Sequence, residues 1–390
     1  MKCSFKDIVI DSRTGLNPRK NFVLGSGDNA YITIKDIYDG KINISDKTDR
    51  VDDAAIQTIK KRSRIAPGDI LFVSIGRIGE TAIVQEKDDS WDVNESVFIF
   101  TINDDIIIPE YFCLLFESED VRNSLTKNSS GSTFKSIKMG QLERMEFDIP
   151  SLNEQKNIVD QINKIKSIRI ARIKELEQFD LLIKARFVEM FGDENNSLNW
   201  DMVNVEDVAD VQVGVVIKPS QYYTGKKDGI PAFRSLNIGE GFIKNMDWVY
   251  FSQEGNDKNS KSILKENDLL IVRSGAPGTA CVVTKEFEGY NAIDIIIAHP
   301  DCSKVNPYYL CTYTNMPHGK KQIQEGTGGA AQQHFNVGKY NKLKLMLPPV
   351  ELQNEFVGFI KQVDKSKFAV QKSLDEAQLL FDSLMQEYFG

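Results

Sequence analysis

Two stretches of the sequence match each other without a gap and decide the fold: Ile149-Pro150-Ser151-Leu152-Asn153-Glu154-Gln155 and Leu347-Pro348-Pro349-Val350-Glu351-Leu352-Gln353. The offset of 198 residues then holds as far as Glu189-Met190-Phe191-Gly192 and Glu387-Tyr388-Phe389-Gly390. Chance does not readily keep so long a register with so many apolar positions in common. The chain is therefore a tandem duplication.

The similarity also extends upstream of these stretches. Gly68-Asp69-Ile70-Leu71 lies over Asn267-Asp268-Leu269-Leu270 at an offset of 199 residues, and Gly131-Ser132-Thr133 lies over Gly329-Ala330-Ala331 at 198. The drift in offset indicates small insertions or deletions in loops. The sequence thus predicts a globular unit followed by a helix, twice, with the divisions 1–148, 149–192, 193–346 and 347–390.

The two repeated tails have the pattern of long helices. Each opens with a proline-containing start and polar residues, which is a typical helix entrance, and each closes at a glycine. About 40 helical residues span roughly 60 Å at 1.5 Å per residue. Such a helix cannot bury an apolar stripe alone, so the two are expected to pair, antiparallel, as a coiled coil rather than to be unrelated surface helices. The apolar positions expected to pack are Ile158, Ile162, Ile165, Leu176, Phe356, Ile360, Val363 and Leu374.

The globular parts have the pattern of a mixed α/β (α+β) fold. Short β-type runs are bounded by Gly, Pro and Asp turns, at Ile70–Ser74, Val97–Thr101, Leu269–Arg273 and Ile293–Ala298. A helical signal at Pro109–Glu119 is repeated at Pro307–Asn315, and the polar stretch 193–197 is expected to be a linker. The overall prediction is two tandem globular domains joined by two long helices, with pseudo-two-fold internal symmetry.

Bulk composition bounds the class of protein. A chain of 390 residues that is 41% hydrophobic and 27% charged has the length of two or three soluble domains. It has no apolar run of the roughly 20 residues that a membrane span needs, and its N-terminal residues do not resemble a signal peptide. The five cysteines have no CxxC pair, so we expect reduced thiols in a cytoplasmic protein, and three histidines argue against a His/Cys metal site.

The net charge does not by itself indicate a nucleic-acid partner. Lys and Arg total 48 against 56 Asp and Glu, which gives −8. A basic surface need only be local, however, and an acidic remainder is compatible with it. Evidence for DNA binding must therefore come from elsewhere in the sequence.

The sequence contains no convincing catalytic motif. Gly25-Ser26-Gly27 superficially resembles a cofactor loop, but Asn29–Ile34 after it has the pattern of a strand rather than a helix. Asn306-Pro307-Tyr308-Tyr309 lacks the second proline of an amino-methyltransferase signature, and Gly326-Thr327-Gly328-Gly329 lacks the Gly-Lys-Ser/Thr ending of a P-loop. No nucleophile–base–orienter set is visible. We therefore expect a protein that is not an enzyme, with no catalytic residues and no metal site.

Cations and amides recur at matching places in the loops of both halves. A DNA reader needs cations for phosphates and amides or guanidinium groups for base edges. A solvated surface charge is the simpler interpretation of any one of them, whereas the recurrence of the set favours function. The candidate DNA-binding residues are Arg13, Arg19, Lys20, Lys60, Lys61, Arg62, Arg64, Arg77, Lys135, Lys218, Lys226, Lys227, Arg234, Lys258, Lys261, Arg273, Gln332, Gln333 and His334.

The ordered set of landmarks, occurring twice, resembles the specificity subunits of type I restriction–modification systems over nearly the whole chain. The landmarks are the two proline-headed helix starts, their Phe-Gly ends, the Gly68-Asp69 turn with Gly76 and Gly79, and Gly131-Ser132-Thr133. The sequence departs from the pattern where Asn267 replaces the glycine of the second Gly-Asp turn and Leu352 replaces the glutamate before Gln353.

This resemblance implies a mechanism. Two target-recognition domains would each read one half of a split, asymmetric DNA sequence, and the paired helices would set the spacing between the half-sites. The helix surfaces would also dock modification subunits, two in number, and restriction subunits would complete a complex that acts in phage defence. The chain itself would bind no cofactor, because the partner subunits use S-adenosylmethionine, Mg and ATP.

Three alternatives remain open from the sequence. One is the recognition subunit of a related restriction system in which one partner chain carries both methyltransferase and nuclease. A second is a non-DNA coiled-coil adaptor, which the acidic net charge favours. The third is a stand-alone methyltransferase or nuclease, which the missing motifs disfavour.

Overall fold

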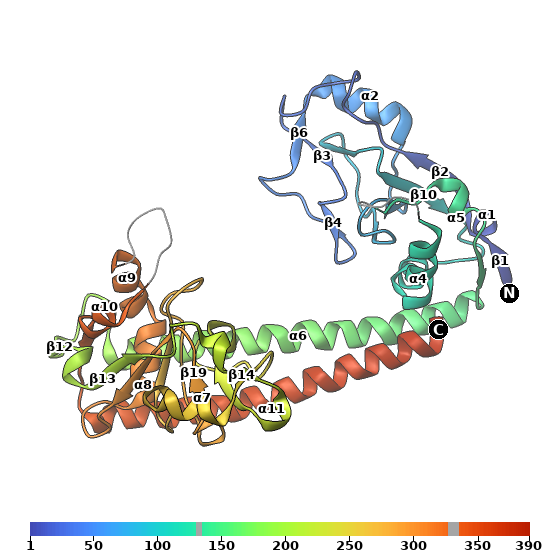
Figure 1. Ribbon diagram of the computed structural model, residues 1–390. Coiled ribbons are helices and arrows are strands. Elements are labelled where there is room, and N and C mark those ends of the chain that lie inside the picture. The colour runs from blue at the N-terminus through green and yellow to red at the C-terminus, as the bar shows by residue number, and fades with distance from the viewer. Residues whose placement is uncertain (130–134, 327–334) are drawn as a thin grey trace. The chain divides into compact units, whose positions relative to one another are not determined.

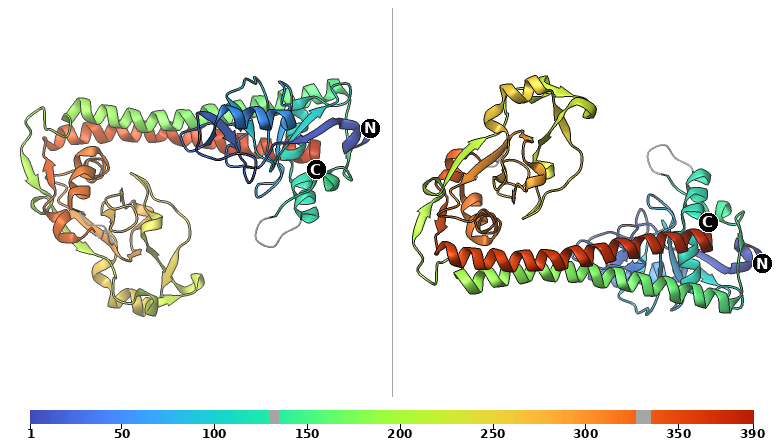
Figure 2. Two further views of the ribbon diagram at one scale, coloured as in Figure 1. Left: turned by 90° about the horizontal axis from the view of Figure 1, so that it is seen from above. Right: turned by 90° about the horizontal axis from the view of Figure 1, so that it is seen from below.

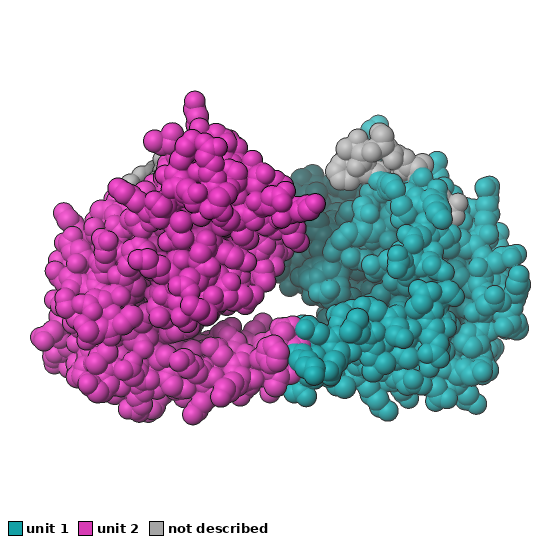
Figure 3. All heavy atoms as spheres, turned by 60° about the horizontal axis from the view of Figure 1, so that its bottom comes forward, with its two compact units in different colours: residues 1–173, 372–390 teal, residues 174–371 magenta. Residues whose placement is uncertain are grey.

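The computed structural model describes residues 1–129, 135–326 and 335–390. Contacts divide the chain into two compact units (Figure 3), of which unit 1 comprises residues 1–173 and 372–390 and unit 2 comprises residues 174–371. Each unit therefore contains one globular part and a portion of both long helices.

Unit 1 is built on a four-stranded antiparallel sheet with both faces covered. Ile70 and Phe72 point into a core with helix α3 (Pro109–Glu117), while Leu71 and Val73 point into a second core with strands β3 (Asn29–Ile32) and β9 (Trp91–Val93). Burial on both faces explains why this run is continuously apolar rather than alternating. The strands, in sheet order, are β2 (Val9–Thr14), β10 (Val97–Ile102), β7 (Ile70–Val73) and β8 (Thr81–Ile83).

A small lobe completes unit 1 on the side of the sheet away from α3. Its sheet has the order β6 (Asp49–Val51), β3 (Asn29–Ile32) and β9 (Trp91–Val93), with β3 and β9 parallel. Helix α2 (Asp53–Ser63) packs on this lobe; it is capped by the Asp52 carboxylate, which accepts a hydrogen bond from the Ala55 amide at 2.8 Å. In Figure 1, α2 lies at the edge of unit 1 away from the long helix α6. The remaining elements are β1 (Lys2–Ser4), β4 (Ile37–Tyr38), β5 (Lys41–Ile42), β11 (Glu146–Asp148), α1 (Phe5–Ile8), α3 (Pro109–Glu117), α4 (Glu119–Asn128) and α5 (Met139–Leu142).

Unit 2 repeats this plan. Its main sheet has the order β13 (Ala209–Val213), β20 (Ile295–Pro300), β17 (Leu269–Val272) and β18 (Ala280–Val282), again antiparallel and covered on both faces. Its lobe has the sheet order β14 (Tyr223–Thr224), β16 (Val249–Phe251), β15 (Ile230–Phe233) and β19 (Asn291–Ala292), with β15 and β19 parallel. The other elements are β12 (Met202–Asn204), β21 (Lys344–Met346), α7 (Gln253–Lys258), α8 (Pro307–Asn315), α9 (Pro317–Gly326), α10 (Val337–Asn341) and the short 3₁₀ turns η1 (Val205–Asp207), η2 (Pro219–Tyr222), η3 (Lys226–Asp228), η4 (Ser235–Asn237), η5 (Ser260–Ser262) and η6 (Lys285–Phe287).

The predicted strand at Ile293–Ala298 begins later than expected. Asp294 has a φ of +49°, a left-handed conformation that interrupts the strand, and β20 starts at Ile295. Ile293 instead forms an isolated parallel bridge with Val215, so the predicted run is not one continuous strand. The other predicted strands and both predicted helices lie where expected.

The two long helices are α6 (Leu152–Phe191) and α11 (Val350–Phe389), each 40 residues long and each inside its predicted segment. They run antiparallel and side by side within each unit (Figure 2): Gln161 contacts Tyr388 in unit 1, and Asp180 pairs with Lys367 at 2.6 Å in unit 2. Six of the eight apolar positions predicted to pack are buried, whereas Leu176 and Leu374 are only half-buried. No helix among the described residues combines the length and the apolar character needed to cross a bilayer.

The helix starts are fixed by a repeated buried glutamine. The Gln155 side chain donates to the carbonyls of Ile106 (2.8 Å) and Pro150 (2.9 Å) and accepts from the amide of Ile108 (2.9 Å). Gln353 makes the equivalent bonds in unit 2, to the carbonyls of Lys304 and Pro348 and from the amide of Asn306. Each glutamine ties its long helix to the loop before α3 or α8.

The helix ends are fixed by aromatic contacts in the opposite unit. Phe389, at the end of α11, packs on Tyr111 of α3 in unit 1, with ring centroids 5.2 Å apart. Phe191, at the end of α6, packs on Tyr309 of α8 in unit 2 at 4.8 Å. Each helix thus starts in one unit and ends in the other, at equivalent positions of the repeat.

Candidate nucleic-acid interface

Unit 1 contains a buried polar cluster around Asp69. This carboxylate accepts hydrogen bonds from the Ala66 amide (2.8 Å), the Thr101 hydroxyl (2.6 Å) and the guanidinium of Arg13 (2.9 Å). The Arg13 side chain is only 8% exposed and also donates to the Arg64 carbonyl. Arg13 therefore joins β2, β7, β10 and the end of α2, and it is not available to a phosphate.

Unit 2 has an equivalent cluster around Asp268, built from different residues. Asp268 accepts from the Lys265 amide at 2.7 Å and lies 2.6 Å from Nδ1 of His299, whose Nε2 lies 2.7 Å from the amide nitrogen of Gln212. These contacts are all satisfied when Nδ1 of His299 donates to Asp268 and Nε2 accepts from the Gln212 amide. The Gln212 amide also donates to the Lys261 carbonyl at 2.6 Å, which ties the lobe to the main sheet.

Three other predicted cations are also engaged inside their domains. The Arg273 guanidinium pairs with Asp294 and donates to the Phe335 carbonyl at 3.2 Å. Arg77 donates to the carbonyls of Ile34 and Ile37 at 2.8 and 3.0 Å, and Arg234 donates to the Asp247 carbonyl. These residues, like Arg13, have contacts within their own domains, and their part in DNA binding stays a prediction.

The remaining cations of unit 1 gather at the outer edge of its lobe. The loop after β2 carries the exposed Arg19 and Lys20, and its residues Leu16 and Phe22 pack on the same small core as α2. The last turn of α2 carries Lys60, Lys61 and Arg62, with Arg64 at its end. Lys60 pairs with Asp89 and Arg64 with Asp11, whereas Arg19, Lys20 and Lys61 have no ion pair within the described residues. Lys135 is also exposed, but it lies on a different part of the unit, next to the Ile75–Ser136 bridge.

The remaining cations of unit 2 lie on the equivalent lobe. Lys218 precedes η2, Lys226 and Lys227 form η3, Lys258 ends α7 and Lys261 lies in η5. All five are exposed, and apart from the Lys258–Glu254 pair none forms an ion pair within the described residues. The lobe around α7, yellow in Figure 2, stands away from both long helices.

The predicted amide and imidazole contacts at Gln332, Gln333 and His334 lie outside the described residues, as do Gly131-Ser132-Thr133. The two carboxylate clusters were not expected from the sequence. Their only signal was the repeated Gly/Asn-Asp turn, and the sequence could not show which residues the aspartate meets. At this turn Gly68 has a φ of +91° and Asn267 a φ of +74°, so asparagine adopts the left-handed conformation that glycine supplies in unit 1.

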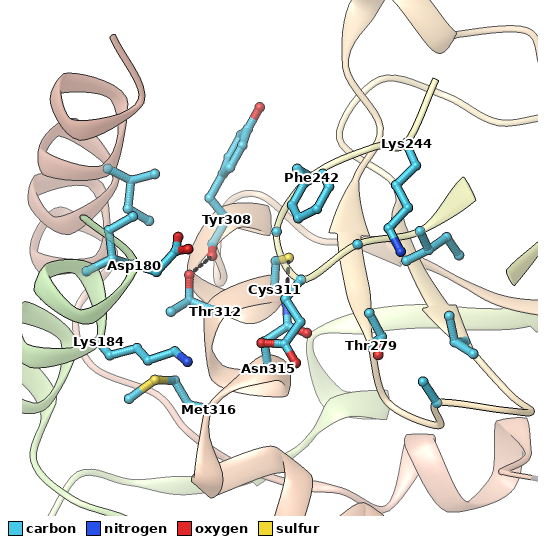
Figure 4. Close-up of a pocket in the computed structure, with 18 of the residues that line it drawn as sticks. Asp180, Lys184, Phe242, Lys244, Thr279, Tyr308, Cys311, Thr312, Asn315 and Met316 are labelled. Atoms are coloured by element: carbon cyan, nitrogen blue, oxygen red, sulfur yellow. Dashed lines mark hydrogen bonds between the residues drawn. The ribbon is translucent and has the colours of Figure 1, made fainter. Parts of the chain in front are cut away.

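A cavity of about 750 Å³ lies in unit 2 between α8, the segment Ser235–Lys244 and both long helices (Figure 4). Its polar groups include the Asp180–Lys367 ion pair, and burial raises the pKa of Asp364. The Cys311 thiol on its wall donates to the Ala280 carbonyl, and burial raises its pKa to about 12. Such a thiol is protonated at neutral pH and is not an activated nucleophile. The cavity therefore lies where the globular part of unit 2 meets the two long helices, and its thiol is not suited to nucleophilic catalysis.

No cluster of three or more potential metal ligands occurs within residues 1–129, 135–326 and 335–390. Burial also raises the pKa of the Cys113 thiol to about 12 and that of Cys281 well above its ordinary value. The five cysteines are all free; Cys302 is exposed, Cys113 is partly buried and the other three are buried.

Comparison with known proteins identifies the repeated architecture. The family model described as type I restriction modification DNA specificity domain matches residues 3–178 and again residues 197–377. The MjaIX specificity subunit of Methanocaldococcus jannaschii is 22% identical over 92% of this chain and 85% of its own length. The StySPI specificity subunit of Salmonella potsdam is 20% identical over 72% of this chain, which spans 64% of that protein.

Solved structures have the same fold. The S subunit of a type I restriction–modification system from M. genitalium matches all of this chain and 96% of its own, with a TM-score of 0.58 and 14% identity. A chain from a study of complex assembly and conformational transition in the type I system matches with a TM-score of 0.63 and 18% identity, covering 100% and 97% of the two chains.

Proposed function

The chain belongs to the type I restriction–modification DNA specificity family, and from this premise we propose that each of its two domains reads one half of a split DNA site. It is a DNA sequence-specificity subunit with two recognition domains, and the subunits of this family recognise DNA rather than catalyse a reaction. The observation that carries the proposal is the duplication itself: one scaffold, with equivalent helix anchors, occurs twice and presents a different exposed lobe each time.

The site is proposed to be asymmetric. Asp69 and Asp268 lie at equivalent positions of the two units, and so do Gln155 and Gln353. The lobes, in contrast, differ in sheet size, in turns and in the placement of exposed cations. Lobes with different surfaces present different donors and apolar groups to base edges. Two unlike half-sites follow, and the site is not palindromic.

The two long helices are proposed to set the distance between the half-sites. Each helix begins in one unit and ends in the other, and 40 residues correspond to about 60 Å. A fixed helix length would permit one spacing and reject others, as dimer geometry does in other DNA-binding proteins.

The partners are proposed to be double-stranded DNA, two modification subunits and restriction subunits, in the cytoplasm. Large apolar side chains remain exposed on the long helices in both units, which supports docking of a partner on each: Ile168, Ile170, Ile173, Leu181, Leu182, Val188, Phe368, Leu379 and Leu380. The partners, rather than this chain, would use S-adenosylmethionine, Mg and ATP.

The test is methylome sequencing of cells that express this chain with its cognate modification subunit, against cells that lack the chain. The proposal predicts a new split motif with methyladenine on both strands. No new methylation, with the complex shown to be assembled, would favour the adaptor alternative instead.

A further inference from the structure

Each recognition domain exposes a pair of adjacent apolar side chains in the segment that leads from the first strand of its main sheet to its lobe, although the two pairs lie at different distances from that strand. In unit 2 the pair is Val216 and Ile217, 48% and 79% exposed, in the loop after β13. In unit 1 it is Val23 and Leu24, 72% and 40% exposed, in the loop after the equivalent strand β2. A single exposed apolar residue is ordinary, but a pair recurring in the same loop of two diverged domains requires an explanation.

The unit 2 loop is held firmly on both sides of its apolar pair. On one side, the Gly214 amide donates to Ile295 at 2.9 Å and the Val215 amide to Ala292 at 2.8 Å, and a Cβ at Gly214 would lie 2.4 Å from the Ala292 carbonyl oxygen. On the other side, Gln221 caps the turn by donating to the carbonyls of Lys218 (3.1 Å) and Ile217 (3.4 Å). The pair is therefore presented to solvent by a fixed backbone and is not a loose loop tip.

The unit 1 loop is fastened in a comparable way. A Cβ at Gly15 would lie 1.8 Å from the Val93 carbonyl oxygen, so this position, like Gly214, allows a close approach to the lobe strand that only glycine permits. Phe22 packs edge-on against Tyr31 at 5.4 Å immediately before the pair, and the Gly25 amide donates to the Arg50 carbonyl at 2.7 Å immediately after it.

Cations lie near both apolar pairs, and they indicate which kind of molecule binds there. Lys218 follows Ile217 directly, Lys226 and Lys227 lie in η3 beyond strand β14 of the same lobe, and Arg19 and Lys20 precede Val23. All five cations are exposed and lack an ion pair within the described residues. A protein partner would need an acidic side chain to neutralise each of these cations. DNA has phosphates that can pair with the cations and apolar groups on its base edges that can contact the apolar pair.

We infer that Val216–Ile217 and Val23–Leu24 are specificity-determining contacts that read thymine C5-methyl groups in the major groove, one pair in each half-site. The inference rests on the proposed function and adds the base class that each domain selects. The flanking cations bind the backbone on either side and so place the apolar pair against the base edge. Each half-site then contains at least one A·T pair whose thymine methyl is required.

The experiment uses the assembled complex of the full chain with its modification subunit, and measures affinity for duplexes that carry the methylome-defined site. Each thymine is replaced in turn by deoxyuridine, which removes the methyl group alone. At one thymine of the half-site read by unit 2, affinity should fall about fourfold, the factor expected when one methyl group is no longer buried. The Ile217→Ser variant should bind the unmodified site with the same fourfold loss and should no longer respond to deoxyuridine at that position. Leu24→Ser should do the same in the other half-site only.

Met202→Ser is the control, because Met202 is an exposed apolar residue of unit 2 (44%) that lies on β12 and not in the lobe. It should leave affinity and the deoxyuridine response unchanged. A wild-type complex that binds its split site but responds to no deoxyuridine substitution would overturn the inference and leave the proposed function intact. An Ile217→Ser chain that no longer binds the modification subunit would overturn it also, by making the pair a protein contact. The absence of any split motif for the wild-type complex would overturn both.

Discussion

The two recognition domains keep the same buried carboxylate but surround it differently. Asp69 meets a permanent cation, Arg13, and the hydroxyl of Thr101, whereas Asp268 meets the imidazole of His299, which in turn contacts Gln212. Both carboxylates cap the same turn by accepting a backbone amide, at 2.8 and 2.7 Å. Both units therefore have an aspartate that caps the turn, whereas the side chains that contact this aspartate from the neighbouring strands differ between the units.

The different surroundings of the two carboxylates distinguish residues that maintain the fold from residues that are proposed to contact DNA. Positions that satisfy backbone groups, such as Gln155 and Gln353, are preserved in identity and in geometry. Positions that only need a compatible partner have changed, and the lobes next to them carry different exposed residues. The following tests act on equivalent positions of the two units, so that a difference between the units is itself the result.

The largest expected effect is on the helix pair. Replacing the buried Ile162 or its repeat equivalent Ile360 with Asp places a carboxylate in an apolar core, at a cost of about 4 kcal/mol. Ile162→Asp should cost more, because Ile360 lines the unit 2 cavity, where a carboxylate can be hydrated. Hydrogen exchange resolved by unit would measure this, with the exposed Ile170→Asp as control. Equal protection in all three variants, with an unchanged DNA site, would count against the helices as a ruler.

The next largest effect on stability is expected from replacing the two buried carboxylates, Asp69 and Asp268. Asp69→Asn removes the buried member of the two carboxylates, Asp69 and Asp11, that pair with the almost fully buried Arg13 guanidinium, and the free energy of unfolding should fall by about 3 kcal/mol. Asp268→Asn still offers an amide oxygen as acceptor to Nδ1 of His299 and should cost about 1 kcal/mol. Urea denaturation of the two variants checks the order, and a larger loss for Asp268→Asn than for Asp69→Asn would contradict it.

Acid should destabilise unit 2 in particular. His318 is buried against Phe187 and Tyr313, where its Nε2 donates to the Gly192 carbonyl, and burial lowers its pKa. Below about pH 6.5 the unfolded chain takes up a proton that the folded state resists, so stability present above this pH is lost as the pH falls.

His318→Gln should remove that part of the acid dependence, and comparing the pH dependence of unfolding in the two proteins measures it. Unit 1 contains no histidine and provides the internal reference. An unchanged pH profile in the variant would mean that His318 does not titrate differently on folding.

The smallest effect on stability, and a selective one on binding, is expected at the lobe cations. Lys61→Ala or Arg62→Ala should leave folding unchanged and weaken DNA binding several-fold, with a salt dependence reduced by about one unit of slope. Recognition should change in one half-site only, while Lys226→Ala should affect the other. Methylome sequencing with binding at two salt concentrations measures both, and identical binding by all variants would remove these cations from the interface.

Much of the fold was predictable because it depends on local pattern. The duplication, the long helices and most strands follow from a register of apolar residues, from prolines at helix starts and from turn glycines. The functions of Gln155 and Tyr111 were not predictable, because Gln155 bonds to Ile108 and Ile106, 47 and 49 residues away, and Tyr111 contacts Phe389 at the other end of the chain. The strand at Ile293 was placed too early because nothing in the sequence showed that Asp294 adopts a left-handed conformation.

The candidate site was predictable in kind but not in detail. The sequence shows which loops contain cations. It does not show that the Arg13 guanidinium bonds to Asp69 and Thr101, whereas Lys61 has no ion pair within the described residues. Val216 and Ile217 were passed over because apolar residues in a loop signal no chemistry until their exposure is known.

The central claim is that two equivalent scaffolds each read one half-site, and a chain with two copies of one reader tests it most directly. Residues 199–346 would replace residues 1–148, leaving both long helices in place, and the methylome would be determined with the modification subunit present. The account predicts a palindromic split motif made of the unit 2 half-site and its inverted copy, at the original spacing. An assembled complex that still methylates an asymmetric motif, or that loses the unit 2 half-site, would contradict it.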